Sequence, residues 1–299
     1  MSHPDPRTAD AVRADVSEQY TRAVTEGTGC CSINPPAAAA SSCCGPTAVV
    51  PKGNAAKLAG YAASDLASLP ADAVTNSFGC GNPVGMALVK PGDTVLDLGS
   101  GAGIDLLLAA RFAGAEGKVI GVDMTDAMIE RARANIAEAG AHNIEVRKGV
   151  IEHLPVGDSS VSVVISNCVI NLSPAKAAVF SEIARVLQPG GRFSVSDIVA
   201  EDLPDWVRAI PDAYSACVSG AIPEQDYIQG LRDAGLTDIE VVDRFVYDPD
   251  QILGMLESDL PGFAERLAGM GITRESIAAV LPTLQGKVAS IKVTGRLPA

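Results

Sequence analysis

The sequence predicts an α/β protein built on a doubly wound, mostly parallel sheet of seven strands. Two observations lead to this fold class. From residue 92 onward, short apolar runs alternate with segments whose apolar residues recur every three or four positions, as in amphipathic helices. The connections between most neighbouring runs are long enough to hold a helix, as crossovers between parallel strands require. Helices are therefore expected on both faces of the sheet.

The individual elements follow from this pattern. The predicted strands are residues 94–99, 118–123, 143–149, 161–166, 190–198, 238–248 and 287–297. The predicted helices are residues 104–114, 125–140, 174–187, 203–217 and 224–235, with more helix within 250–282. Thr125 and Ser173 are the expected caps at the starts of the second and third of these helices. The last two strands are expected to close the sheet as an antiparallel pair.

Three parts are expected along the chain. Residues 1–55 form an N-terminal appendage, in which apolar spacing predicts one amphipathic helix at 9–26 and the Pro-, Ala- and Ser-rich residues 33–54 predict a linker. Residues 56–198 hold the core of the fold. Residues 199–299 complete the sheet, add a small C-terminal α/β extension and are expected to cover the acceptor site.

The composition argues against some classes of partner. The chain carries 23 Lys and Arg against 36 Asp and Glu, a net charge of −13, which would repel a phosphate backbone or an anionic membrane. No apolar stretch approaches the roughly 18 residues of a membrane-spanning helix, and the N-terminus does not have the build of a signal peptide. We therefore expect a cytoplasmic protein with a small-molecule ligand, without nucleic acid or a membrane as partner.

A glycine-rich turn marks the candidate cofactor site. In DLGSGAGID, Gly99, Gly101 and Gly103 lie between the first predicted strand and the first helix after it. Glycines let the backbone approach a ligand closely, and the helix N-terminus presents unpaired amides. The spacing differs from the dinucleotide fingerprint, and the charge of Asp97 would repel a pyrophosphate but suit a cationic amino-acid ligand. A nicotinamide dinucleotide is thus disfavoured.

Residues at the next two strand ends extend this candidate site. Asp123 ends the second strand, where its carboxylate could accept hydrogen bonds from both hydroxyls of a ribose. The alternative is structural, with Asp123 capping the helix that begins at Thr125. After the third strand, Val150 and Ile151 could flank an adenine, with Glu152 nearby.

The order of these motifs resembles that of class I S-adenosylmethionine-dependent methyltransferases. The resemblance rests on DLGSGAGID, GVDMT, KGVIEHLP, an apolar fourth strand and LQPGGRF, over residues 92–198. It implies a Rossmann-like fold with S-adenosylmethionine as cofactor, its methionine part beside the glycine turn, its ribose on Asp123 and its adenine near residues 150–152. The cofactor-binding residues expected are Asp97, Gly99, Ser100, Gly101, Gly103, Asp123, Met124, Val150, Ile151, Glu152 and Asn167.

The cysteines are the second chemical feature of the sequence. Seven occur, at positions 30, 31, 43, 44, 80, 168 and 217. An odd number in a cytoplasmic chain argues for thiols that act as ligands, nucleophiles or small core residues, and against a disulfide framework. Taken singly, Cys80, Cys168 and Cys217 could each be a buried apolar residue. The adjacent pairs, Cys30–Cys31 and Cys43–Cys44, could be exposed thiols of a disordered tail.

Cys80, Cys168 and Cys217 lie in segments that the predicted fold could bring to one edge of the sheet. They stand in SFGCGNPVG, in SNCVINLS at the end of the fourth strand, and in ACVSGAIP after the fifth. Three converging thiolates suit a soft trivalent centre, and arsenic(III) fits better than zinc, which requires four tetrahedral ligands and has no lone pair to methylate. With the cofactor motifs, these segments resemble the arsenite S-adenosylmethionine methyltransferases over residues 77–223.

This second resemblance implies that Cys80, Cys168 and Cys217 bind As(III), with Cys43 and Cys44 delivering or exchanging it. The substrate would be arsenite or a thiol conjugate of it. The arsenic lone pair would attack the sulfonium methyl in line, and the protein would act mainly by positioning. Because arsenic becomes formally pentavalent, cysteines oxidised in returning the electrons would need thioredoxin or glutathione.

Two other functions fit the same residues. One is methylation of a small carbon or oxygen acceptor, such as a quinone precursor, with the cysteines as core residues. That function predicts Cys→Ser variants of near-normal activity. The other is a non-catalytic, thiol-based metalloid-binding protein, against which the intact Asp97 and Asp123 argue.

Overall fold

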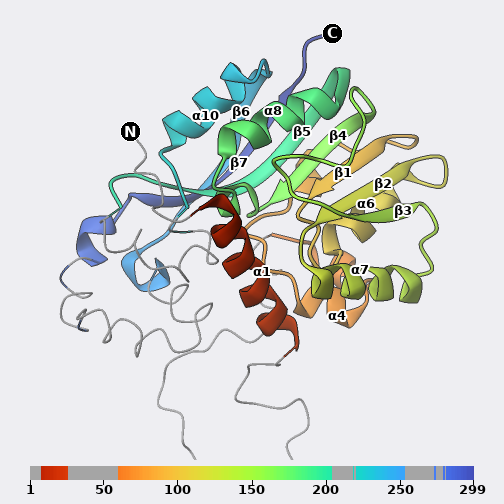
Figure 1. Cartoon of the computed structure of the whole chain (residues 1–299), viewed down its shortest axis with the longest axis horizontal. Coiled ribbons are helices and arrows are strands. Elements are labelled where there is room, and N and C mark those ends of the chain that lie inside the picture. Colours follow the sequence, from red (N-terminus) through yellow and green to blue (C-terminus); the bar gives the residue numbers. More distant parts are fainter. Residues whose placement is uncertain are drawn as a thin grey trace, which may run out of the picture.

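A seven-stranded mixed sheet forms the centre of the molecule (Figure 1). The computed structural model describes residues 8–25, 60–203, 218, 220–252, 273, 279 and 281–299. The strands are β1 (Thr94–Leu98), β2 (Lys118–Asp123), β3 (Ile144–Lys148), β4 (Val161–Asn167), β5 (Leu187–Ala200), β6 (Thr237–Val246) and β7 (Val288–Arg296). Their order is β3-β2-β1-β4-β5-β7-β6, and the first five are parallel to one another. The predicted doubly wound α/β fold is confirmed.

The closing strands agree with the prediction of an antiparallel pair, since β6 and β7 run antiparallel to each other. Of the seven strands, β7 alone runs against the others. It lies between β5 and β6 and is antiparallel to both, so β6 runs in the same direction as β5. The strand pattern predicted the existence of β6 and β7 correctly, but it carries no information on which of the two lies at the edge.

Helices cover both faces of this sheet. In the described part of the chain they are α1 (Ala9–Thr25), α3 (Ala63–Leu66), α4 (Ala71–Thr75), α5 (Pro83–Met86), α6 (Ile104–Ala113), α7 (Asp126–Glu138), α8 (Lys176–Val186) and α10 (Glu224–Asp233), with 3₁₀ turns η1 (Ile170–Leu172) and η3 (Leu281–Leu284). The helices α3, α4 and α5 escaped prediction because four or five residues show no helical period. The predicted helix at 203–217, most of 250–282 and the linker at 33–54 lie outside the described residues. Of the helices described, none is long and apolar enough to cross a membrane.

The starts of two helices differ from the prediction in detail. Thr125 stands at the N-cap of α7, but its side chain makes no capping bond, and its N–H instead donates to Oδ1 of Asp123 at 2.8 Å. Ser173 does not cap α8, which begins at Lys176. The Ser173 hydroxyl accepts a hydrogen bond from the N–H of Ala175 at 3.0 Å. The prediction for Ser173 is wrong because this local serine turn lies ahead of the helix.

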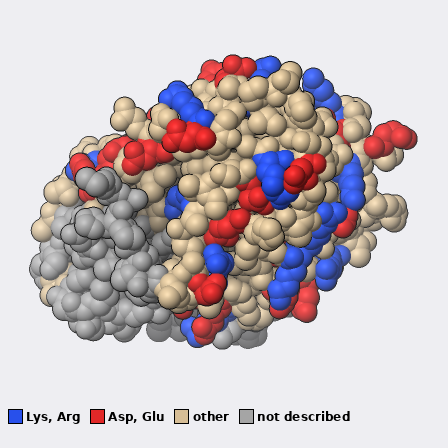
Figure 2. Space-filling view, turned by 45° about the horizontal axis from the view of Figure 1, so that its top comes forward, with Lys and Arg blue, Asp and Glu red and all other residues tan. Residues whose placement is uncertain are grey.

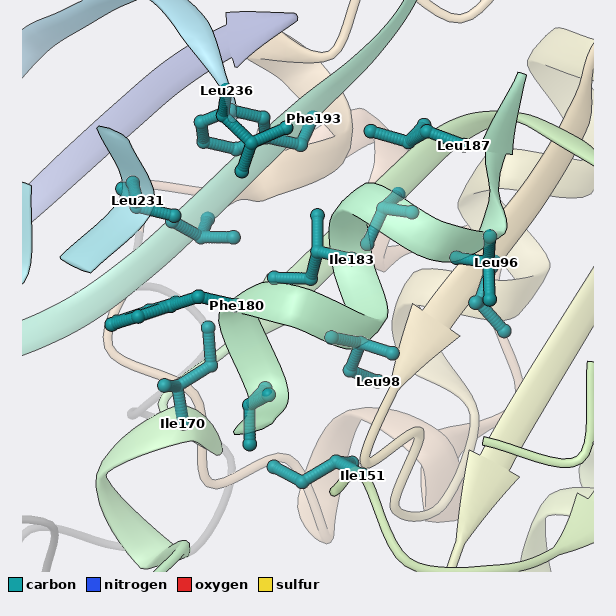
Figure 3. Packing of buried hydrophobic residues seen from close by; sticks show 14 of the residues in the cluster. Leu96, Leu98, Ile151, Ile170, Phe180, Ile183, Leu187, Phe193, Leu231 and Leu236 are labelled. Atoms are coloured by element: carbon teal, nitrogen blue, oxygen red, sulfur yellow. The ribbon is translucent and has the colours of Figure 1, made fainter. Parts of the chain in front are cut away.

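Alternate residues of the central strands build a core on each face of the sheet. On one face, Leu96 and Leu98 of β1 belong to a cluster with Phe180 and Ile183 of α8 and Phe193 of β5 (Figure 3). The cluster on the other face includes Val95, Leu106, Leu108, Val163 and Ile165, from β1, β4 and α6. Burial of one such side chain stabilises the fold by about 1.5–3 kcal/mol. Because β1 and β4 are buried on both faces, the loops that follow them have rigid starting points.

Charged side chains are mixed on the surface. On the face shown in Figure 2, blue Lys and Arg side chains lie beside red Asp and Glu side chains. Exposed ion pairs such as Lys148 with Asp126, at 2.7 Å, typically contribute at most about 1 kcal/mol each. The two apolar clusters therefore stabilise the fold more than these surface pairs do.

Candidate active site

A cavity lies at the carboxyl ends of β1, β2 and β4, which are adjacent in the sheet. Crevices of this kind, outside the ends of parallel strands, are where open α/β sheets bind ligands. All the predicted cofactor residues except Gly103 line it. Gly103 is instead the N-cap of α6. Further walls come from α1 and from the segment 76–79.

The glycine turn after β1 brings backbone to the wall of this cavity. Gly99, Gly101 and Gly103 have φ values of 64°, 51° and 94°, in the left-handed region that favours glycine. A Cβ on Gly99 would come within 2.5 Å of the Val169 side chain, whereas a Cβ on Gly101 would meet nothing within 4 Å. Gly99 therefore allows close packing of two loops, and Gly101 leaves its backbone open to a ligand.

Three buried carboxylates line the same cavity. Asp97, Asp105 and Asp123 are 2%, 4% and 9% exposed. Burial, followed by the charges of Asp105 and Asp123, raises the pKa of Asp97 well above its usual range. Burial also raises the pKa of Asp105 to about 6 and raises that of Asp123. Since like charges in a desolvated site disfavour one another, the arrangement favours a cationic ligand.

Asp123 makes the hydrogen bonds expected from its structural alternative. Its Oδ1 accepts from the N–H of Thr125 at 2.8 Å, and its Oδ2 accepts from the N–H of Gly101 at 2.9 Å. These bonds hold the end of β2 against the glycine turn. Each carboxylate oxygen can accept a second hydrogen bond, so contact with a ribose stays compatible with this structural role and stays a prediction.

The loop after β3 forms the wall opposite the glycine turn. Val150, Ile151 and Glu152 all line the cavity, as does Met124 after β2. Oε1 of Glu152 accepts a hydrogen bond from the hydroxyl of Ser173 at 2.8 Å. The loop is therefore tied to the segment that follows β4, and its two aliphatic side chains offer an apolar surface for a flat ring.

Helix α1 forms a wall that the sequence did not indicate. Arg13, Val16 and Tyr20 line the cavity. A guanidinium nitrogen of Arg13 lies 3.1 Å from Oε1 of Glu152, and the ring of Tyr20 packs edge-on against Phe78 with centroids 5.6 Å apart. The apolar spacing predicted this helix correctly, but periodicity identifies an apolar face and not the surface on which that face packs.

Tyr61 and Asp105 are further residues that the sequence analysis missed. The Tyr61 hydroxyl donates to Oδ1 of Asp105 at 2.8 Å and accepts from Nδ2 of Asn167 at 2.9 Å. Burial and the adjacent Asp105 raise the pKa of Tyr61, so the phenol stays protonated. Tyr61 belongs to no motif. Asp105 ends the quoted DLGSGAGID, and an acidic residue in the first turn of a helix facing a ligand loop was the available signal.

The structure brings Cys80 and Cys168 together. They form a disulfide with their Cα atoms 5.8 Å apart, and Cys168 lines the cavity. Cys168 is 5% exposed and has a φ of 56°, in the left-handed region that residues other than glycine rarely adopt. Its N–H donates to the carbonyl of Ser196 at 2.8 Å. The end of β5 thus supports the strained turn that carries Cys168.

The predicted cysteine chemistry is changed by this pairing. The cysteine count predicted free thiols, whereas the disulfide leaves neither sulfur able to bind arsenic until it is reduced. The count could not reveal that two residues 88 positions apart meet in space. Cys217, Cys43 and Cys44 lie outside the described residues, as do Cys30 and Cys31.

The residues present fit S-adenosylmethionine, a cation with an amino-acid part, a ribose and an adenine. Ser77 and Ser100 line the cavity, and their hydroxyls are buried without a hydrogen-bond partner in the described structure. Asp97 is likewise buried, and no hydrogen bond lowers its pKa. Buried polar groups normally have partners, so these three mark positions at which a polar ligand would complete the site.

Comparison with known proteins places the chain in a family. A sequence profile described as a methyltransferase domain matches residues 89–251, more than half of the chain. An arsenite methyltransferase of Halobacterium salinarum is 43% identical over 257 residues, which are 83% of this chain and 65% of the relative. One from Aquipseudomonas alcaligenes is 40% identical over 198 residues, 64% of this chain and 54% of that protein. The chain thus spans less than two thirds of the length of these two curated relatives.

A solved structure agrees with this placement. The crystal structure of an arsenic(III) S-adenosylmethionine methyltransferase from Chlamydomonas reinhardtii superposes with a TM-score of 0.60 and 34% identity, covering 79% of this chain and 72% of that one. The chain therefore belongs to the methyltransferase-domain family and, within it, to the arsenite methyltransferase group.

Proposed function

We propose that this protein methylates arsenite with S-adenosylmethionine as methyl donor. The observation that carries the proposal is that Cys168, paired with Cys80, lines the same cavity as the buried carboxylates. A soft thiol site and a site for a cation therefore open onto one space. The relatives named as arsenite methyltransferases support arsenic as the acceptor.

The proposed cofactor site uses the residues of the glycine turn and the strand ends. When bound, S-adenosylmethionine supplies an electrophilic methyl group on a cationic sulfonium. Asp97 offers a carboxylate to the amino-acid part, Asp123 accepts from the ribose hydroxyls, and Val150 and Ile151 flank the adenine. The buried hydroxyl of Ser100 donates to whichever oxygen or nitrogen of the ligand lies beside it.

The proposed acceptor site forms when the disulfide is reduced. Arsenous acid is neutral, so the acidic protein does not repel it. Each thiol that binds arsenic loses its proton and displaces one hydroxyl group, and the two leave as water. With Cys80, Cys168 and Cys217 as ligands, arsenic is pyramidal and its lone pair occupies the open side. The cysteines thus hold and orient the nucleophile, and no general base is required.

The Cys80–Cys168 disulfide supports a role for this pair in returning electrons. Methyl transfer raises arsenic formally from trivalent to pentavalent. Oxidation of the two thiolates to one disulfide releases two electrons, which return the methylated arsenic to the trivalent state. The pair is close enough to form this bond without rearranging the fold, since it is already formed in the structure.

A reductant must then act from outside. Cys80 is partly exposed whereas Cys168 is 5% exposed, so an incoming thiol reaches the sulfur of Cys80 first. Thioredoxin or glutathione can supply that thiol, and both keep thiols reduced in the cytoplasm. We therefore propose that the protein works in the cytoplasm with one of these reductants.

The test is a comparison of wild type with Cys168→Ser. The purified protein is incubated with arsenite, S-adenosylmethionine and a thiol reductant, and arsenic species are separated by mass spectrometry. Wild type should yield methylated arsenicals, and Cys168→Ser should yield none, because its hydroxyl cannot replace a soft ligand. Affinity for S-adenosylmethionine should stay within about threefold, or ~0.6 kcal/mol.

Ser181→Ala, a change of similar size on an exposed part of α8, is the matched control and should behave as wild type. If wild type yields no methylated arsenical, arsenic is not the methyl acceptor. Equal activity of Cys168→Ser would instead favour a carbon or oxygen acceptor, with the cysteines as core residues.

A further inference from the structure

We propose that Asn167 is a positioning residue that fixes the distance between Cys80 and Cys168. Asn167 directly precedes Cys168 at the end of β4, and its side chain holds the residue that directly follows Cys80. The inference deepens the proposed function, on which it rests for the purpose of the thiol pair. The contacts that carry it are independent of arsenic and of the cofactor.

The amide of Asn167 binds the backbone of Gly81 on both sides. Its Oδ1 accepts from the N–H of Gly81 at 3.1 Å, and its Nδ2 donates to the carbonyl of Gly81 at 2.7 Å. This pair of bonds imitates the exchange between two residues of adjacent strands. It docks the SFGCGNPVG loop onto the end of β4, although residues 81 and 167 are 86 positions apart.

A buried acidic group fixes the orientation of this amide. Nδ2 of Asn167 also lies 3.1 Å from Oδ2 of Asp105 and 2.9 Å from the hydroxyl of Tyr61. Both are acceptors for N–H, so the amino side of the amide faces them and Oδ1 is left to face the N–H of Gly81. Flipping the amide would break these bonds and place two donors against each other. Asn167 is thus held in the one orientation that binds the loop.

The glycines on either side of Cys80 show how closely the loop is docked. A Cβ on Gly79 would lie 2.2 Å from Nδ2 of Asn167, and a Cβ on Gly81 would lie 2.3 Å from Oγ of Ser196. Neither glycine has a positive φ, so contact and not backbone conformation accounts for them. A larger residue at either position would force the Asn167 amide, the Ser196 side chain or the loop itself to shift.

The consequence is that the two thiols are already in position before anything binds them. A preorganised pair loses less conformational entropy when it closes on a ligand or forms a disulfide. Ser290 adds a weaker tie, since its hydroxyl donates to the carbonyl of Cys80 at 3.3 Å. Loss of the Asn167 amide should therefore disfavour the disulfide relative to two free thiols.

The experiment measures the thiol–disulfide equilibrium of this pair in glutathione redox buffers, without arsenic or S-adenosylmethionine. Full-length protein is used with the other cysteines changed to Ser, and the reduced fraction is read by alkylation and mass spectrometry. In Asn167→Ala, the equilibrium constant for the disulfide should fall about tenfold, which is ~30 mV. Gly79→Ala, whose Cβ would displace the same amide, should shift it in the same direction and serves if Asn167→Ala does not fold.

The matched control is Asn143→Ala, which removes a partly buried amide whose Nδ2 donates to the carbonyls of Ala110, Gly114 and Gly117. These bonds lie away from both cysteines, so this variant should keep the wild-type equilibrium within about twofold. Equal constants for wild type, Asn167→Ala and Gly79→Ala would overturn the proposal, as would an equal shift in Asn143→Ala. A shift confined to Asn167 and Gly79 in a protein that does not methylate arsenite would retain the positioning role and reject the proposed function.

Discussion

Asp97, Asp105 and Asp123 bring more negative charge into the interior than their neighbours balance. The backbone supplies hydrogen bonds to Asp123, and Tyr61 and Asn167 supply them to Asp105, but the pKa of every one of the three carboxyls is still raised by burial. Groups with pKa values shifted in this way cluster at functional sites. A bound cation would reverse the shift by stabilising the ionised forms.

We therefore expect the affinity for S-adenosylmethionine to rise with pH. The pKa of Asp105 is raised to about 6, so its carboxyl is protonated below that pH and ionised above it. Because the sulfonium favours the ionised form, the dissociation constant should be about tenfold lower near pH 8 than near pH 5. Isothermal titration calorimetry at both pH values measures it. S-adenosylhomocysteine, which has no sulfonium charge, is the control, and an equal pH dependence of the two ligands would contradict the electrostatic account.

Residues at strand ends could be predicted from the sequence, and residues held by tertiary contacts could not. Asp97 and Asp123 end apolar runs, and parallel strands place such ends at one edge of the sheet. Tyr61 reaches the site through side-chain hydrogen bonds to Asp105 and Asn167, which no local pattern encodes. The Cys80–Cys168 disulfide lies where Asn167 docks a loop through its bond to Gly81, 86 positions away in the sequence. Such a long-range contact leaves no periodic signal in the sequence.

At the scale of the element, α1 is the part whose role changed most. The sequence indicated an amphipathic appendage, and the structure makes it a wall of the cavity. An ion pair between Arg13 and Glu152, whose side chains are 25% and 12% exposed, ties it to the loop after β3. Partial exposure limits what this pair contributes to global stability. The pair is nevertheless placed where it can control how readily the wall separates from the cavity.

Arg13→Ala should therefore speed release of S-adenosylmethionine about three- to tenfold while changing the free energy of unfolding by no more than ~1 kcal/mol. Stopped-flow displacement gives the release rate, and urea titration gives the stability. The control is Arg22→Ala, which removes an exposed ion pair with Glu18 on the same helix, away from the residues that line the cavity. Equal release rates for Arg13→Ala and wild type would show that α1 does not control access.

The length of a helix decided whether the sequence could predict it. The helices α6, α7, α8 and α10 repeat their apolar residues over ten or more positions, and these were predicted close to their observed bounds. The helices α3 and α5 have four residues each and take their conformation from the surface on which they pack. The order of β6 and β7 in the sheet was not predictable for a different reason, because side-chain patterning does not encode which strand lies at the edge.

For the whole molecule, sheet order explains why the proposed donor and acceptor sites meet. The strands β2, β1 and β4 are adjacent and parallel, so the ends that carry Asp123, the glycine turn and Cys168 lie side by side. The pairing of β4 with β5 then sets Ser196 beneath the turn of Cys168. One edge of the sheet thus combines the buried carboxylates proposed to bind the cationic donor with the cysteine pair proposed to bind the soft acceptor.

We propose that this thiol pair both holds arsenic and returns the electrons, and a single-turnover experiment can test both roles at once. Fully reduced protein, freed of external thiol, is mixed with arsenite and S-adenosylmethionine carrying a deuterated methyl group, and quenched with an alkylating agent. Mass spectrometry then measures deuteromethylated arsenic and the Cys80–Cys168 disulfide in the same sample. We expect deuteromethylated arsenic and the Cys80–Cys168 disulfide to increase together, in equal amounts. Two results would contradict these roles. One is methylated arsenic in a sample whose Cys80 and Cys168 are both alkylated and therefore were not oxidised, and the other is no methylated arsenic from the reduced protein.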